Sequence, residues 1–158
     1  MIRAAILTVS DRCANGEQED RSAPVLVEIL SAHGFEIAGQ ALVPDEQDVI
    51  ARELVRLCGE SRCDVVFTTG GTGLGPRDVT PEATCSVCDR LVPGLGELMR
   101  AESLKRTQNA VLSRGTAGLR GSTLIINLPG SPKAVRECLD VILDTLPHAV
   151  EMMRGGGH

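Results

Sequence analysis

Short apolar runs rich in β-branched residues alternate along this chain with longer segments whose apolar residues recur at helical spacing. Four runs have the length and composition of strands, and they cover residues 3–9, 35–43, 63–69 and 123–128. The predicted helices open at Pro24, after Asp45, at Thr80, at residue 95 and after Pro132. Thr80 is predicted to be the N-cap of its helix, with Pro81 at the first helical position. Strands that alternate with helices form a mostly parallel sheet that is covered on both faces. The sequence therefore predicts a three-layer α/β/α fold.

The chain has the length of one domain. Its 158 residues are enough to bury a single core, and no repeat, low-complexity segment or linker divides them. We expect one domain over residues 1–154. Residues 155–158, three glycines and a histidine, are expected to form a flexible tail.

The composition argues against several classes of protein. A net charge of −5 and only two aromatic residues disfavour a nucleic-acid partner, which needs clustered basic side chains or stacking platforms. No apolar run approaches the roughly 20 residues of a membrane span, so we expect no membrane partner. The six cysteines suit reduced thiols in a cytoplasmic protein better than a disulfide framework. A metal site at Cys85 and Cys88 is disfavoured because no second ligand pair has zinc-site spacing.

Polar or glycine-containing turns follow four predicted strands. In open α/β sheets, ligands bind beyond the carboxyl ends of the strands, beside helix N-termini. The turns that meet this description are Ser10 and Asp11, Pro44 and Asp45, residues 69–73, and residues 129–132. We therefore expect one ligand site to be built from these turns.

Four glycines occur within six residues after the third predicted strand, at Gly70, Gly71, Gly73 and Gly75. Such a turn lets the backbone approach a ligand, and its N–H groups suit phosphate oxygens beside the next helix. The alternative is that the glycines only build a tight strand-to-helix turn. Named phosphate motifs do not fit, because the P-loop ending is missing and Pro76 stands where a dinucleotide fingerprint needs glycine.

Two aspartates stand at the ends of two predicted strands. Asp78 follows the glycines, and its alternative role is a loop carboxylate paired with Arg77 or bonded to turn amides. Asp45 is equally well explained as the N-cap of the following helix. A carboxylate that faces a phosphate site normally acts through Mg²⁺, which bridges it to phosphate oxygens. The pair is therefore a candidate site for Mg²⁺ and a nucleotide.

Two further polar positions have two interpretations each. Ser131 precedes Pro132, so it is either an N-cap or part of a ligand-binding turn with Gly130. Arg114, next to Ser113, is either a solvated surface residue or a clamp for an anionic group. No Ser-His or Cys-His pair is recognisable.

Five segments together resemble the MogA/MoaB family of molybdenum-cofactor biosynthesis proteins. They are residues 9–12, 43–47, 69–73, 76–84 and 128–132. The resemblance spans nearly the whole chain and implies a MogA/MoaB-like fold. The retained Asp78 favours the MogA branch, the molybdopterin adenylyltransferases. These transfer AMP from Mg·ATP to the terminal phosphate of molybdopterin and release pyrophosphate.

The resemblance also implies roles for residues of this chain. Asp78 would be the essential carboxylate, and Asp45 would be its partner in holding Mg²⁺ and the ATP phosphates. The implied nucleotide contacts are Gly70, Gly71, Thr72, Gly73, Pro129, Gly130 and Ser131. The implied contacts to the pterin or its phosphate are Ser10, Asp11, Ser113 and Arg114. A homotrimer and a contact with the molybdate-insertion protein are implied as well.

Two other functions compete with the adenylyltransferase. The first is a non-catalytic, MoaB-like protein that binds or carries the pterin. The second is a nucleotide hydrolase or pyrophosphatase, because the same fold occurs in nicotinamide-nucleotide recycling proteins. The presence of both Asp45 and Asp78 favours the transferase over the carrier.

Overall fold

A computed structural model describes residues 1–156 of the chain. Within these residues six strands form one sheet, in which four neighbouring strands are parallel and the last two pair antiparallel. In their order across the sheet they are β2 (Phe35–Val43), β1 (Ile2–Val9), β3 (Val65–Thr69), β6 (Thr123–Leu128), β5 (Ala117–Arg120) and β4 (Arg90–Leu91). The predicted mostly parallel sheet is confirmed.

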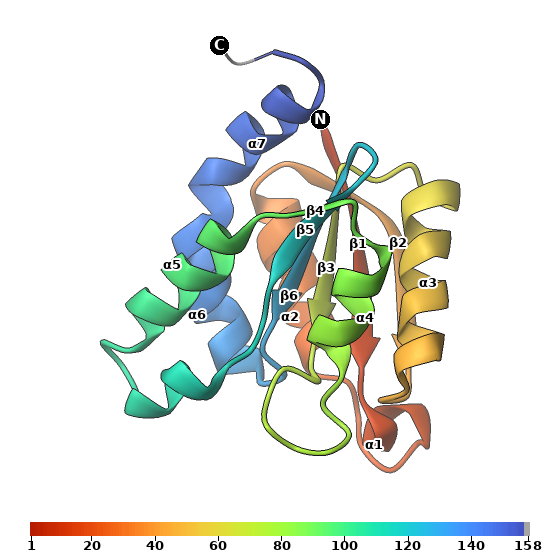
Figure 1. The fold of residues 1–158 in the computed structure, drawn as a ribbon, viewed down its shortest axis with the longest axis vertical. Coiled ribbons are helices and arrows are strands. Elements are labelled where there is room, and N and C mark those ends of the chain that lie inside the picture. The colour runs from red at the N-terminus through yellow and green to blue at the C-terminus, as the bar shows by residue number, and fades with distance from the viewer. Residues whose placement is uncertain (157–158) are drawn as a thin grey trace.

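Helices cover both faces of the sheet (Figure 1). One face packs against α2 (Ser22–Ala32), α5 (Pro93–Ser103), α6 (Pro132–Ile142) and α7 (Leu146–Met153). The other packs against α3 (Gln47–Glu60) and α4 (Thr80–Val87). The remaining elements are α1 (Asp11–Ala14) and the 3-10 turns η1 (Gln108–Leu112) and η2 (Leu143–Thr145). The three-layer α/β/α architecture is therefore confirmed.

The central strands supply both apolar cores. Ala4 and Ile6 of β1 join the core under α2 and α6, whereas Ala5 and Leu7 join the core under α3. Successive side chains of a strand point to opposite faces, so a strand covered on both sides is apolar without alternation. This explains why the predicted strands appear in the sequence as continuous apolar runs.

Four features differ from the predicted elements. Helix α1 and the strands β4 and β5 were not predicted, because elements of two to four residues carry too little periodicity to detect. The final helix was expected to continue to Val150, but it breaks at Leu143 and restarts at Leu146. Pro147 in the new first turn explains the break, because proline has no N–H for an interior helical bond.

The N-terminus and α7 lie away from the loops that follow the parallel strands (Figure 1). Of the predicted tail, Gly155 and Gly156 continue the turn that closes α7, and residues 157–158 lie outside the described residues. No helix within residues 1–156 has the length and apolar character of a membrane span. All six cysteines, which fall within the described residues, are free thiols.

Candidate active site

The register of the parallel strands brings four loops to one edge of the sheet. Val9 at the end of β1 pairs with Val43 at the end of β2, and Thr69 at the end of β3 pairs with Leu128 at the end of β6. Parallel strands that end level place their following loops side by side. The four turns predicted to form one site therefore meet.

The glycine turn after β3 is fixed by close backbone packing. Gly70 and Gly71 have φ of +100° and +69°, the region that favours glycine. A Cβ on Gly70 would stand 2.2 Å from the carbonyl oxygen of Val9, and one on Gly71 would stand 2.3 Å from Oγ1 of Thr80. Any larger residue at either position would displace the turn.

Thr80 locks this turn to helix α4. The prediction that Thr80 is the N-cap was wrong: Val79 precedes the helix, and Thr80 is its first residue. The buried hydroxyl of Thr80 instead donates to the carbonyl of Gly70 at 2.9 Å, and its N–H donates to Gly71 at 3.1 Å. An N-cap side chain would have accepted an N–H from the first turn of its own helix, whereas the Thr80 hydroxyl is bonded to the glycine turn.

The turn keeps four N–H groups unused. Within residues 1–156, the amides of residues 71–74 donate no hydrogen bond. Arg114 donates to two carbonyls of the turn, from its backbone N–H to Thr72 at 2.9 Å and from Nε to Gly73 at 2.8 Å. Because the carbonyls are bound and the amides are free, the turn is suited to an anion.

Asp78 lies over the later glycines of the loop. Its Oδ2 accepts the N–H of Gly75 at 2.9 Å. A Cβ on either Gly73 or Gly75 would stand 2.9 Å from the same oxygen, so these glycines make room for the carboxylate. Arg77 does not pair with Asp78, contrary to one alternative from the sequence. The other alternative, a bond to a turn amide, is confirmed for one oxygen only.

Asp45 is tied to the loop after β1. The prediction that Asp45 caps the next helix was wrong, because Glu46 occupies the cap position of α3. Asp45 and Asp11 instead exchange hydrogen bonds: Oδ2 of Asp45 accepts the N–H of Asp11 at 2.8 Å, and Oδ1 of Asp11 accepts the N–H of Asp45 at 3.0 Å. This exchange aims Asp45 at the glycine turn, with Oδ1 3.2 Å from where a Cβ on Gly71 would stand.

Arg77 sets the charge balance of this carboxylate group. It donates two hydrogen bonds to Asp11, both at 3.0 Å, and these lower the pKa of Asp11. Burial raises the pKa of Asp45, and the negative charges of Asp11 and Asp78 raise it further. Arg77 thus neutralises Asp11, while Asp45 and Asp78 remain two like charges close enough to interact. The sequence analysis did not recognise Arg77 as a site residue.

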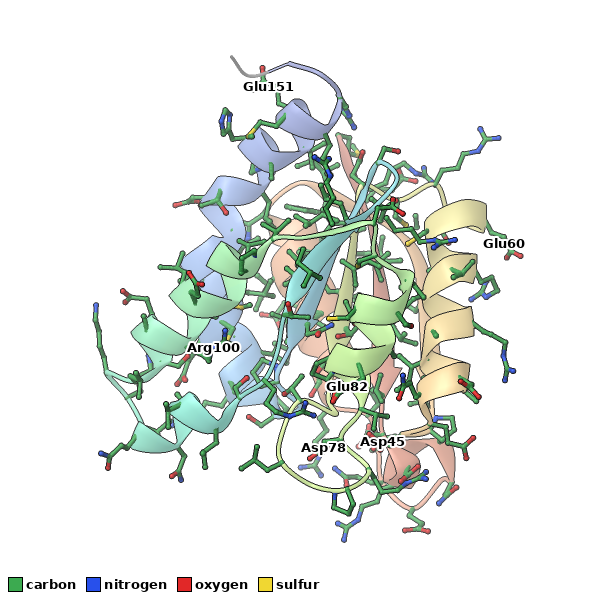
Figure 2. All side chains as sticks on the ribbon, in the orientation of Figure 1. Asp45, Glu60, Asp78, Glu82, Arg100 and Glu151 are labelled. Atoms are coloured by element: carbon green, nitrogen blue, oxygen red, sulfur yellow. The ribbon has the colours of Figure 1, made fainter. Side chains whose placement is uncertain are left out.

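The two aspartates offer one free oxygen each. Within the part of the chain that the structure describes, Oδ1 of Asp45 and Oδ1 of Asp78 accept no hydrogen bond. Figure 2 shows both side chains at the loop end of the sheet. Over the same described residues, no group of three or more His, Cys, Asp or Glu side chains is arranged to hold a metal ion. The donors present are carboxylate oxygens, the type that Mg²⁺ takes together with phosphate oxygens and water.

The loop after β6 lies against the glycine turn. The carbonyl oxygen of Pro129 accepts a hydrogen bond from the hydroxyl of Thr69 at 2.7 Å. A Cβ on Gly130 would stand 3.4 Å from the Cα of Gly70. Ser131 accepts the N–H of Ala134 at 3.2 Å, so the predicted capping role is confirmed. Its nucleotide contact stays a prediction.

A cavity lies on each side of this loop. A mainly apolar one of about 240 Å³ lies between α5 and α6 and is lined by Pro129, Ser113 and the buried Asn127. The other, of about 310 Å³, is bordered by Gly130, Gly70 and residues that follow β1. The loop after β6 therefore borders two cavities that could hold separate groups of a ligand, and only the second of them also touches the glycine turn.

The four predicted pterin contacts do not form one cluster. Ser10 caps α1 by accepting the N–H of Cys13 at 3.2 Å, and Asp11 is occupied by Arg77. Ser113 borders the apolar cavity, whereas the guanidinium of Arg114 is bonded to the glycine loop. Their contact with a pterin stays a prediction.

Comparison with known proteins identifies the family. The family described as "Probable molybdopterin binding domain" matches residues 5–148. This chain belongs to that family. The MogA/MoaB resemblance drawn from the sequence is therefore confirmed.

Members of the molybdopterin-binding family resemble the chain over nearly its whole length. The molybdopterin adenylyltransferase of Helicobacter pylori J99 is 46% identical over 98% of this chain and 89% of its own. The molybdopterin adenylyltransferase of Escherichia coli K12 is 38% identical over 98% of this chain and 86% of its own. A crystal structure of the molybdopterin biosynthesis enzyme MoaB of Thermus thermophilus has a TM-score of 0.92 and 50% identity, covering 98% of each chain. The fold is thus that of the family.

Proposed function

We propose that the protein is a molybdopterin adenylyltransferase. It transfers AMP from ATP to the terminal phosphate of molybdopterin and releases pyrophosphate. A phosphate oxygen of the pterin attacks the α-phosphorus of ATP, and the bond to the bridging oxygen of pyrophosphate breaks. The adenylyltransferase names of relatives that are 38% and 46% identical over most of the chain support this activity.

The observation that carries the proposal is the meeting of Asp45 and Asp78 beside unused amides. Transfer of this kind requires positioning and charge neutralisation rather than a protein nucleophile. The amides of residues 71–74 bind phosphate oxygens of ATP. Pro129 and Gly130, in the loop packed against this turn, border one cavity each. The two cavities beside that loop allow the nucleotide and the pterin to approach from different sides.

Mg²⁺ is the proposed cation, and the carboxylates of Asp45 and Asp78 would hold it. When bound, it neutralises phosphate charge in the transition state. Burial, followed by the charges of Asp11 and Asp78, raises the pKa of Asp45, and a nearby cation would favour its ionised form. Asp11, already paired with Arg77, orients Asp45 rather than binding the ion.

The second candidate is a non-catalytic pterin carrier. The 50% identity to a protein named MoaB does not favour it, because that protein is described as a molybdopterin biosynthesis enzyme. A carrier has no need for two carboxylates with free oxygens at the phosphate turn. The transferase is therefore preferred.

The test is pyrophosphate release by the purified protein given molybdopterin and Mg·ATP. We expect release that requires the pterin and the metal, with one adenylated pterin formed per pyrophosphate. Tight pterin binding without release would leave only the carrier. Hydrolysis of free nucleotide without pterin would instead establish the hydrolase considered from the sequence. Addition of EDTA in excess over Mg²⁺ should stop the reaction.

We extend the proposal to the assembly and location implied by the family resemblance. The protein is expected to form a homotrimer in the cytoplasm and to pass its product to a molybdate-insertion protein. Light scattering coupled to size-exclusion chromatography measures the mass of the assembly, and a single species of monomer mass would contradict the homotrimer.

A further inference from the structure

One arginine holds both ends of the glycine loop. Arg114 follows η1, and its guanidinium donates from Nε to the carbonyl of Gly73 at 2.8 Å and from Nη2 to the carbonyl of Asp78 at 2.7 Å. Its own N–H donates to Thr72 at 2.9 Å. A planar guanidinium presents its donors in fixed directions, so these contacts set the separation of the two ends of the loop.

Glu82 holds the guanidinium in that position. Both its carboxylate oxygens accept Nη1 of Arg114, at 2.6 and 3.2 Å. Glu82 lies in the first turn of α4, the helix that begins just after Asp78. The loop is thus clamped to its own helix across a separation of 32 residues in the sequence. Figure 2 shows Glu82 and Asp78 at the same end of the sheet.

The clamp fixes Asp78 at two points. Arg114 holds its carbonyl, and the N–H of Gly75 holds one oxygen of its carboxylate. Gly75 lies between the two main-chain positions that Arg114 grips, so the support for the carboxylate depends on the same clamp. Release of Arg114 would leave Asp78 on a loop whose tip is exposed to solvent. Leu74, in this loop, has 65% of its surface exposed.

We propose that Arg114, oriented by Glu82, is a positioning residue that fixes the carboxylate of Asp78 for transfer. The proposal rests on the adenylyl transfer proposed above. It replaces the role expected from the sequence, in which Arg114 contacts the anionic pterin. The two roles differ in the kinetic parameter that they control. A positioning residue acts on kcat, whereas a direct pterin contact acts on the KM for molybdopterin.

The experiment compares Arg114→Ala, Arg114→Lys and Glu82→Ala with a matched control, Arg154→Ala. Arg154 also joins distant segments, because its guanidinium pairs with the carboxylate of Asp64 at 2.9 Å, but this pair lies at the opposite end of the strands. We expect Arg114→Ala to lower kcat by about 100-fold, the cost of a misplacement near 1 Å, with the KM for molybdopterin nearly unchanged. Lysine restores little, because one ammonium group cannot span three acceptors.

Glu82→Ala should lower kcat in the wild-type background and have no further effect in the Arg114→Ala background, since Glu82 acts through the arginine. Arg154→Ala should retain wild-type kinetics. A raised KM for molybdopterin at unchanged kcat, or additive effects of Glu82→Ala and Arg114→Ala, would overturn the proposal. If Arg114→Ala does not fold, Arg114→Lys and Glu82→Ala decide it by the same criteria.

Hydrogen exchange separates this proposal from the proposed function. The amides of Gly75 and Asp78 are bonded inside the loop and should exchange faster in the Arg114 and Glu82 variants than in Arg154→Ala. Unchanged exchange would refute the clamp even in an active enzyme. If the wild-type protein forms no adenylated pterin, the transfer reaction is refuted, whereas the exchange measurement still determines whether Arg114 orders the loop.

Discussion

Asp78→Asn separates the chemistry of the site from its folding. Asparagine has the size of aspartate, and its amide oxygen can accept the N–H of Gly75 in place of Oδ2, now at 2.9 Å. The substitution removes the negative charge and with it the carboxylate oxygen that accepts no hydrogen bond within residues 1–156. It also removes one of the like charges that raise the pKa of Asp45.

The expected effects differ greatly in size. Weakening one charged hydrogen bond costs about 1 kcal/mol, and the lost repulsion with Asp45 offsets part of it. For a chain of this size that corresponds to a change in Tm of at most about 4 °C. Loss of a metal-binding carboxylate at the transferring phosphate should cost about 4 kcal/mol in the transition state, which is roughly a 1000-fold loss of kcat.

The assay is pyrophosphate release with saturating molybdopterin and Mg·ATP, with Tm followed by circular dichroism on the same samples. Asp48→Asn is the matched control, an exposed aspartate three positions beyond Asp45 in the first turn of α3, and it should keep wild-type turnover. Wild-type-like turnover by Asp78→Asn would refute the catalytic assignment. A fall in Tm of more than about 10 °C would show that the carboxylate is structural instead.

Three further perturbations test the geometry around this carboxylate. Arg77→Ala removes the charge that lowers the pKa of Asp45, so the acid limb of the kcat/KM profile should move to higher pH; an unmoved limb contradicts the assigned coupling. Gly73→Ala places a Cβ 2.9 Å from Oδ2 of Asp78 at an ordinary φ, so turnover should fall at least tenfold, by roughly 1.4 kcal/mol, with little change in Tm. Asn127→Ala removes three buried hydrogen bonds, two that Nδ2 donates to threonine hydroxyls and one that Oδ1 accepts from a backbone N–H. The free energy of unfolding should fall by about 3 kcal/mol, which lowers Tm by about 6–12 °C, and an unchanged Tm would contradict this.

The sequence by itself determined the parts of the fold that depend on local pattern. The strands at the centre of the sheet are buried on both faces, so their apolar runs are visible without knowledge of their partners. The glycines that follow β3 and Asp78 lie within nine residues of one another, so the glycine turn with a carboxylate at its end was predictable too. The short edge strands β4 and β5 were not, because two to four residues hold no detectable period.

The partner of each charged side chain was decided only by the tertiary structure. Asp45 had the sequence context of a helix cap, but the register of β1 against β2 places Asp11 beside it across 34 residues. Arg77 is next to Asp78 in sequence, yet the loop turns it towards Asp11. Arg114 is bonded to the Asp78 carbonyl across 36 residues. Local periodicity reports which face of an element is buried, whereas hydrogen-bond partners between loops depend on how the strands align, and no single segment encodes that.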